Sequence, residues 1–158
     1  MLSGQVVDVF NRSIYPGRIF AEKGIIQEVH RTQANIEPGF LIPGLVDSHI
    51  HIESSMLTPQ QFSAVAMNHG TVATVSDPHE IANVFGYEGI RYMMDASKFN
   101  PLNVFFMMPS CVPSTNMETT GSHLRAFDIF PFLREKWVLG LGEMMNYPGV
   151  IGREPDVM

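Results

Sequence analysis

The chain of 158 residues contains a single cysteine, Cys111, so it cannot form an intramolecular disulfide. This scarcity favours a reducing compartment. Positive charge is also scarce, because 10 Lys and Arg stand against 16 Asp and Glu and give a formal net charge of -6. No block of like charge occurs. We therefore expect neither a nucleic acid nor an anionic membrane as a partner.

Long apolar runs and targeting signals are missing as well. No apolar run approaches the ~18 residues that a membrane-spanning helix needs. The first five residues, MLSGQ, lack the basic region and apolar core of a signal peptide. Hydrophobic residues make up 45% of the chain and charged residues 16%, a globular composition rather than a disordered one. We therefore expect a soluble cytoplasmic protein with one domain, or one domain and a small appendage.

Several catalytic motifs are absent too. The chain has no G-x-x-x-x-G-K-[ST] phosphate loop, no G-x-G-x-x-G fingerprint and no G-x-S-x-G nucleophile elbow. His51-Ile52-Glu53 matches the H-x-E of the zinc nucleobase deaminases. That site also needs two cysteines in a P-C-x-x-C pair, and one cysteine cannot supply them.

The pattern of apolar residues changes near residue 43. Before it, short apolar runs separated by turn residues predict a small β meander from Gln5 to Val29. After it, apolar strands are expected leading into His49 and at residues 71–76, 104–108 and 137–141. Helices are expected between them, one capped by Thr58 and ended by Gly70, the others at residues 85–99 and 124–133.

This alternation is typical of parallel βα units and predicts an α/β fold. Crossover helices cover both faces of an open sheet or the outside of a closed barrel, and the pattern alone fits either. We divide the chain into a small β segment, residues 1–43, and a βα segment, residues 44–158, which contains four βα units.

Polar clusters lie where the expected strands end. His49 and His51 are two residues apart, so on a strand they share a face and can converge on one metal ion. Glu143 ends the last strand, and a carboxylate can ligate one cation or bridge two. Taken singly, the histidines could alternate by chance, and Glu143 could be an exposed side chain at the start of a loop.

A third cluster, Asp77-Pro78-His79-Glu80, follows the second expected strand. Alone it could be a turn in which Asp77 caps the following segment. In βα folds, however, ligands bind at the carboxyl ends of the strands. The third strand also ends in polar residues, Ser110 and Cys111. The joint pattern favours a metal site over coincidence.

These motifs resemble a known family. Residues 43–51, PGLVDSHIH, resemble the first barrel strand of the metal-dependent amidohydrolases. Longer runs are similar to the adenine deaminase branch of that superfamily: residues 52–59 (IESSMLTP), 77–84 (DPHEIANV), 109–113 (PSCVP) and 140–146 (GLGEMMN). The resemblance extends from about Gln5 to the end of the chain.

The resemblance implies a (β/α)8 TIM barrel beside a small β-sandwich that both chain ends build. We therefore expect a partial barrel, its first four βα units, preceded by the first part of the β-sandwich. The implied activity is hydrolysis of adenine to hypoxanthine and ammonia at a two-metal centre, with manganese or iron. A homo-oligomer acting on free adenine is the expected assembly.

The resemblance also implies roles for individual residues. His49 and His51 would bind one metal ion, and Glu143 would bridge both ions where many relatives have a carboxylated lysine. Glu80 would act as the acid/base near a purine ring nitrogen, with His79 beside it as a second catalytic residue. Substrate-binding roles are assigned to three residues, Glu53, Ser110 and Cys111.

The sequence departs from the family pattern in having only four of the eight βα strands. Further ligands, two histidines and an aspartate, come from later strands in the family. The last residues, 154–158, are expected to form the first turn of a helix, with Pro155 at its first position. We therefore expect the chain alone to be inactive or nearly so. The alternatives are a non-catalytic or self-associating fragment, and an amidohydrolase for another cyclic amidine or amide.

Overall fold

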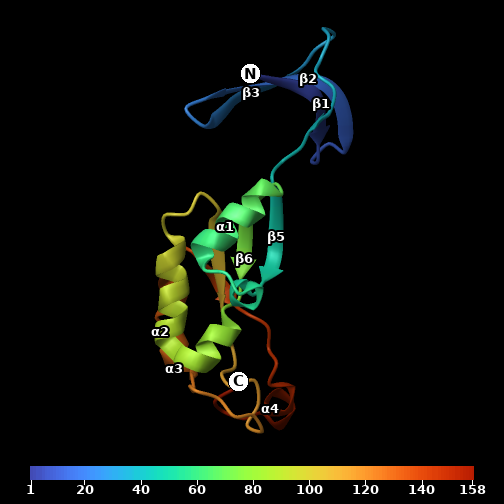
Figure 1. Ribbon diagram of the computed structural model, residues 1–158. Coiled ribbons are helices and arrows are strands. Elements are labelled where there is room, and N and C mark those ends of the chain that lie inside the picture. Colours follow the sequence, from blue (N-terminus) through green and yellow to red (C-terminus); the bar gives the residue numbers. More distant parts are fainter. The chain divides into compact units, whose positions relative to one another are not determined.

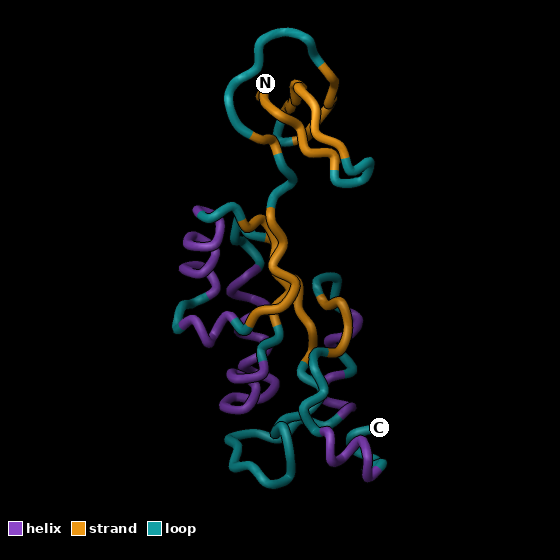
Figure 2. The backbone as a smooth tube through the Cα atoms, turned by 90° about the vertical axis from the view of Figure 1, so that its right-hand side faces the viewer, coloured by secondary structure: helices purple, strands orange, loops and turns teal.

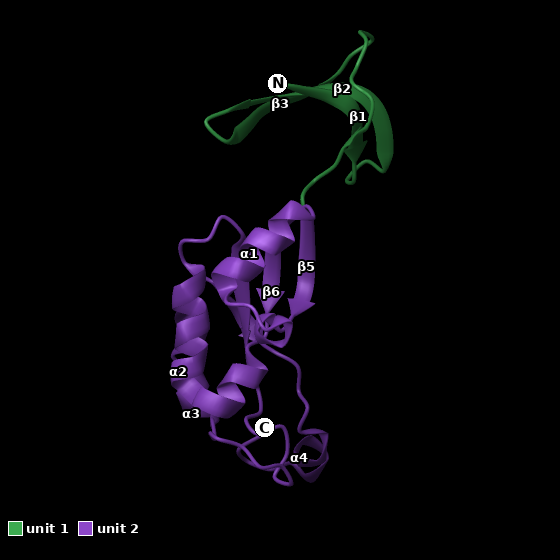
Figure 3. Cartoon of the chain, viewed as in Figure 1, with its two compact units in different colours: residues 1–44 green, residues 45–158 purple.

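The computed structural model describes residues 1–158, which form two compact units (Figure 3). The first unit is Met1–Gly44 and the second is Leu45–Met158. Figure 1 labels most of their helices and strands. No helix has the length and apolar character needed to cross a membrane.

The first unit is a single four-stranded sheet. Its strands are β1 (Leu2–Asp8), β2 (Ser13–Glu22), β3 (Ile25–Arg31) and β4 (Phe40–Leu41), in the order β3-β2-β1-β4. The first three strands pair in antiparallel fashion, which confirms the predicted meander, and β4 pairs with β1 in parallel. The unit has one layer, so the β-sandwich is not confirmed.

The second unit is built on a parallel sheet with the strand order β5-β6-β7-β8. These strands are β5 (Leu45–Ile50), β6 (Thr71–Ser76), β7 (Asn103–Met108) and β8 (Val138–Leu141), and every neighbouring pair is parallel. The predicted α/β class with four parallel strands is confirmed. Because the strands are ordered as in the sequence, their carboxyl ends lie along one edge in chain order.

The first two helices connect these strands. Helix α1 (Pro59–Asn68) begins as predicted, because Thr58 caps it by accepting the backbone N–H of Gln61. Helix α2 (His79–Ser97) begins at His79, so the predicted start at Phe85 was wrong. The backbone breaks from helical geometry at Gly86, where φ is 57°. The regular apolar spacing becomes visible only after this kink.

The later helices differ more from the prediction. The helix expected at residues 124–133 is divided into α3 (Ala126–Ile129) and a 3-10 turn, η2 (Phe132–Arg134), with Pro131 between them. Helix α4 (Tyr147–Gly152) was not predicted, although Asn146 caps it. The turn expected at residues 154–158 is present after α4 has ended, as one hydrogen-bonded turn in which the N–H groups of Val157 and Met158 both donate to the backbone oxygen of Glu154. A 3-10 turn, η1 (Ile52–Ser55), follows β5.

The core of the second unit lies between α2 and the sheet. Alternate side chains of β7 point to one face and are buried there, as expected for a strand with a period of two. They pack in one cluster with the buried face of α2, whose central members are Val104, Phe106, Met108, Ile90, Met93 and Met94. Figure 2 shows the helices and strands of this arrangement from a second direction.

Replacing Phe106 with alanine is expected to destabilise the second unit by about 3–5 kcal/mol, because it leaves a cavity in this cluster. Phe106 is 1% exposed, whereas Phe99 at the end of α2 is 96% exposed. The matched change Phe99→Ala should alter the free energy of unfolding by less than about 0.5 kcal/mol. Urea unfolding followed by circular dichroism measures both values, and equal effects would contradict the placement of the core.

Apolar side chains remain exposed on the two outer strands of the parallel sheet. Leu45 and Val46 on β5 are 51% and 61% exposed, and Leu139 and Leu141 on β8 are 57% and 52% exposed. Each outer strand also has one edge without a hydrogen-bonded neighbour. Such edges and patches bind further protein or promote association.

Candidate metal centre

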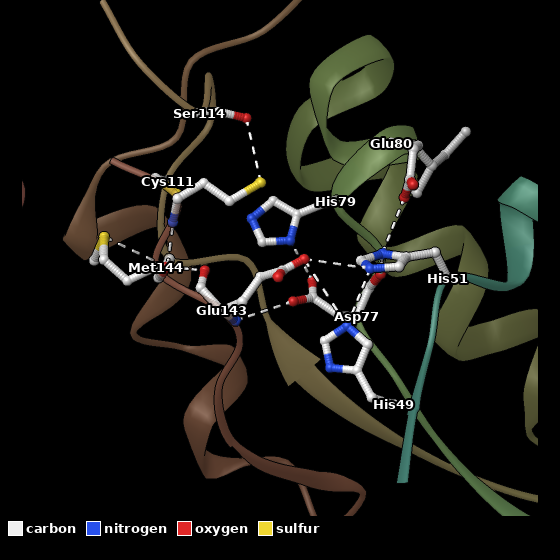
Figure 4. A network of polar contacts seen from close by, with 12 residues as sticks. His49, His51, Asp77, His79, Glu80, Cys111, Ser114, Glu143 and Met144 are labelled. Atoms are coloured by element: carbon white, nitrogen blue, oxygen red, sulfur yellow. Dashed lines mark hydrogen bonds and ion pairs between the residues drawn. The ribbon is translucent and has the colours of Figure 1, made fainter. Parts of the chain in front are cut away.

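The titratable residues singled out in the sequence meet at the carboxyl edge of the parallel sheet (Figure 4). His49 and His51 come from the end of β5, and Glu143 follows β8. A sheet with a strand spacing of about 4.8 Å separates first and fourth strands by roughly 14 Å. The His and Glu side chains together span this separation because they point toward one another.

Three donor atoms form a compact group. Nε2 of His49 lies 3.1 Å from Nε2 of His51. Oε1 of Glu143 lies 3.3 Å from Nε2 of His51 and 3.9 Å from Nε2 of His49. All three side chains are at least partly accessible, with exposed fractions of 51% for His49, 22% for His51 and 44% for Glu143. A cation can therefore reach the group from solvent.

The spacing of these donors fits one divalent cation. Bonds of about 2.0–2.1 Å that meet at roughly 100° place two ligand nitrogens about 3.1 Å apart. Two imidazoles and a carboxylate are also a donor set that Zn²⁺, Mn²⁺ and Fe²⁺ accept. Three protein ligands leave further positions for water or substrate.

The orientation of His51 also supports binding of a divalent cation. Its Nδ1 lies 2.7 Å from the backbone oxygen of Asp77, which can only accept a hydrogen bond. Nδ1 therefore carries the proton, and the lone pair on Nε2 faces His49 and Glu143. A histidine that donates its other N–H to a carbonyl is the usual arrangement of a metal ligand.

Asp77 is the residue that the sequence assignment missed. Its side chain is 1% exposed, and Oδ2 accepts the backbone N–H of Glu143 at 3.3 Å. The carboxyl group also lies against Gly142, where a β-carbon would be 2.8 Å from Asp77 Cγ. The glycine is thus required for this close approach. The polar cluster after β6 contains Asp77 and was therefore a signal for it. As an expected cap of the following segment, however, Asp77 was assigned no role at the site.

His79 lies beside the donor group, with its ring centroid 6.3 Å from that of His51, and is 2% exposed. Its Nδ1 forms an ion pair with Oδ1 of Asp77 at 2.7 Å. Burial alone would lower the pKa of His79, but its interactions with Asp77 and, to a smaller extent, with Cys111 together outweigh burial, and the pKa is raised above its ordinary value. The structure thus places His79 against Asp77 and out of contact with solvent, although the sequence had placed it beside Glu80 at the substrate.

Glu80 lies on the other side of His51. One carboxylate oxygen accepts the hydroxyl proton of Ser54 at 2.8 Å, and the other lies 3.2 Å from Nδ1 of His51. Its side chain is 49% exposed, so a ligand can reach it. These two contacts orient an accessible carboxylate next to the ring of His51, which itself belongs to the donor group (Figure 4).

Glu53 occupies a more enclosed position near the start of α2. Its Oε1 accepts the backbone N–H of Ile81 at 3.1 Å. Burial raises the pKa of Glu53, and the backbone hydrogen bonds oppose this only in part. In this structure its carboxylate holds the first turn of α2, and its other oxygen is buried without a hydrogen-bond partner.

Ser110 and Cys111 hold the segment that follows β8. The hydroxyl of Ser110 donates to the backbone oxygen of Glu143 at 2.6 Å. The sulfur of Cys111, which is 6% exposed, accepts the backbone N–H of Met145 at 3.3 Å. These two residues therefore fix the backbone on both sides of Met144, next to the candidate ligand Glu143.

Comparison with known proteins agrees with this geometry. Residues 40–147 match the Amidohydrolase family. The chain is 45% identical over 160 residues to an adenine deaminase from Desulfatibacillum aliphaticivorans, covering 99% of this chain and 28% of the relative. It is 46% identical over 158 residues to an adenine deaminase from Methanothermobacter thermautotrophicus, covering 100% of this chain and 29% of the relative. The chain thus spans less than a third of the length of these relatives.

Proposed function

Because the chain belongs to the amidohydrolase family, we propose that it supplies the first half of the catalytic site of an adenine deaminase. The reaction is hydrolysis of adenine to hypoxanthine and ammonia. The observation that carries the proposal is the convergence of His49, His51 and Glu143 beside the accessible carboxylate of Glu80. The similarity to adenine deaminases over essentially the whole chain supports the choice of substrate.

In this proposal the three donors hold a divalent cation, manganese or iron. Such a cation supplies Lewis acidity, which lowers the pKa of water and makes hydroxide available near neutral pH. His51 keeps Nε2 free for the cation because Asp77 accepts its Nδ1 proton. Glu143 would also help to hold the second cation of a two-metal centre.

Glu80 is the proposed acid/base. Hydroxide adds to C6 of adenine, and negative charge develops on the ring nitrogen N1. Glu80 would transfer a proton there, held in place by Ser54 and His51. The N1 proton would stay in the product, and the hydroxyl proton of the adduct would pass to the departing amine, so that ammonia leaves and the C6 carbonyl of hypoxanthine forms. Glu53, Ser110 and Cys111 would line the adenine site, in addition to the backbone contacts that they make.

The finer architecture is also proposed. The four parallel strands would be the first four of a (β/α)8 barrel, residues 44–158, because the outer strands keep unpaired edges and exposed apolar side chains. The sheet of residues 1–43 would form part of a small β-sandwich. A homo-oligomer working in the cytoplasm on free adenine completes the proposal.

A segment exchange tests the substrate directly. Residues 1–158 should replace the matching segment of the Methanothermobacter thermautotrophicus adenine deaminase, to which the chain is 46% identical. We expect the Mn²⁺-loaded chimera to convert adenine to hypoxanthine and ammonia within about tenfold of the parent rate. The same chimera with Glu80→Gln should lose about 10²–10⁴-fold in kcat, because it cannot transfer the proton.

The control is Glu88→Gln in the same chimera, because Glu88 is a carboxylate on α2 outside the donor group. It should leave kcat within about twofold of the unmodified chimera. A folded, metal-loaded chimera that hydrolyses another cyclic amidine or amide and leaves adenine unchanged would overturn the proposed substrate. Retained activity in Glu80→Gln would instead overturn the role of Glu80.

A further inference from the structure

We infer that Asp77 is a positioning residue that aligns both His51 and Glu143, and so couples the ends of β5 and β8. The inference rests on the proposed metal site. It adds a residue that touches neither the cation nor adenine and acts through the two candidate ligands.

The backbone of Asp77 aligns the ligand on β5. Its N–H donates to the backbone oxygen of Ile50 at 2.9 Å, which extends the pairing of β5 and β6 beyond Ser76. Its backbone oxygen then lies 2.7 Å from Nδ1 of His51. One peptide segment is thus attached to the end of β5 and fixes both the ring orientation and the tautomer of His51.

The carboxylate of Asp77 aligns the ligand on β8. Oδ2 accepts the backbone N–H of Glu143 at 3.3 Å, and Gly142 packs against the carboxyl group. The same backbone is held from the other side by Ser110, whose hydroxyl donates to the oxygen of Glu143 at 2.6 Å. Glu143 therefore leaves β8 with both of its backbone polar groups engaged, which limits where its side chain can point.

His79 holds the Asp77 carboxylate in place. The two side chains form an ion pair at 2.7 Å, and they are 2% and 1% exposed. A buried ion pair is weak evidence for stability, because the desolvation of both charges can exceed their attraction. Asp77 instead contacts both candidate ligands, through its backbone oxygen to His51 and through Oδ2 to the N–H of Glu143, which favours a role in orienting them. Partners that orient metal ligands typically contribute 10–100-fold to metal affinity.

The test uses the full chain with Zn²⁺ as the probe, because Zn²⁺ is diamagnetic and accepts two imidazoles and a carboxylate. Zn²⁺ affinity is measured by competition with a chelator, counting only the binding that His51→Ala removes. Asp77→Ala is expected to weaken this binding by about 10–100-fold. Asp77→Asn keeps the volume and one acceptor oxygen, so its loss should be smaller but still measurable. Nitrogen-15 NMR of the metal-free protein should show a changed amide shift for Glu143 in Asp77→Ala, because its acceptor is removed, and His51 protonated on Nδ1 in both proteins, because the backbone oxygen of Asp77 remains.

The matched control is Thr74→Val. Thr74 is 0% exposed and lies on β6, the strand that Asp77 follows. Its hydroxyl has no hydrogen-bond partner, so the change alters the buried side of β6 without removing a contact to either candidate ligand. It should leave both Zn²⁺ affinity and the His51 tautomer unchanged. A purely structural role for Asp77 would lower stability and leave the Zn²⁺ affinity of the folded protein as it is.

Wild-type Zn²⁺ affinity in a folded Asp77→Ala variant would overturn the inference and leave the metal site standing. If Asp77→Ala does not fold, Asp77→Asn decides in the same way, because equal affinity to the wild type overturns the inference. A wild-type chain that shows no Zn²⁺ binding dependent on His51 would overturn the proposed metal site, and the inference with it. The two failures are thus distinguishable.

Discussion

The 158-residue chain alone is expected to convert adenine to hypoxanthine at least about 10⁴-fold more slowly than a full-length relative. The resemblance implies further metal ligands from later strands, and their loss should cost more than the roughly 10²–10⁴-fold that one positioned proton-transfer group typically contributes. The chain holds two groups of three donors that share His51, so only one cation at a time can use that imidazole. The open edges of the parallel sheet also admit water, which weakens electrostatic interactions at the site.

The measurement is adenine loss together with hypoxanthine formation, after reconstitution with Mn²⁺ or Fe²⁺. A full-length relative, such as the adenine deaminase from Desulfatibacillum aliphaticivorans, serves as the positive control. Turnover by the 158-residue chain at roughly 1–10³ s⁻¹, abolished by His49→Ala, would refute the prediction. It would mean that these residues suffice for the chemistry.

His51→Ala is expected to lower the affinity of the chain for Mn²⁺ or Zn²⁺ by more than about 100-fold. The change removes the donor that lies closest to both other donors, 3.1 Å from His49 Nε2 and 3.3 Å from Glu143 Oε1. The expected loss exceeds the roughly 10–100-fold that is typical of a residue that only orients a ligand, because here the bond to the cation itself disappears.

His69→Ala is the matched control, because His69 is an exposed imidazole at the C-terminus of α1. It should leave affinity unchanged within about twofold. Isothermal titration calorimetry with each metal gives both numbers. Equal affinities in the two variants would show that the cation binds elsewhere, and would remove the basis for assigning His49 and Glu143 as ligands.

Much of the fold follows from short-range sequence signals. The parallel strands are runs of apolar, often β-branched residues, and Thr58-Pro59 marks the start of α1 by a capping geometry that needs no tertiary contact. The start of helix α2 was harder to predict, because Gly86 interrupts the helix and the regular apolar spacing begins only after it. Helix α4 was missed because its six residues include a proline and two glycines, which predict a turn.

The site residues could be predicted where titratable side chains directly follow a strand. His49, His51 and Glu143 are polar groups that directly follow apolar runs, and a parallel sheet brings such ends to one edge. The part played by Asp77 was not predictable, because it depends on Gly142 from another strand and on burial by the surrounding chain. Likewise, nothing in the local sequence distinguishes an exposed His79 from one enclosed against Asp77.

The distance along the sheet between β5 and β8 has a thermodynamic consequence. Neither strand is the other's neighbour, so the donor group exists only when β6 and β7 have paired between them. A cation that binds this group favours the folded state alone, and its binding free energy becomes folding free energy. At a free concentration a hundredfold above Kd, this linkage is worth about 2.7 kcal/mol. Metal binding would therefore link the first and last strands of the sheet and make its unfolding more cooperative, in addition to preparing the site for chemistry.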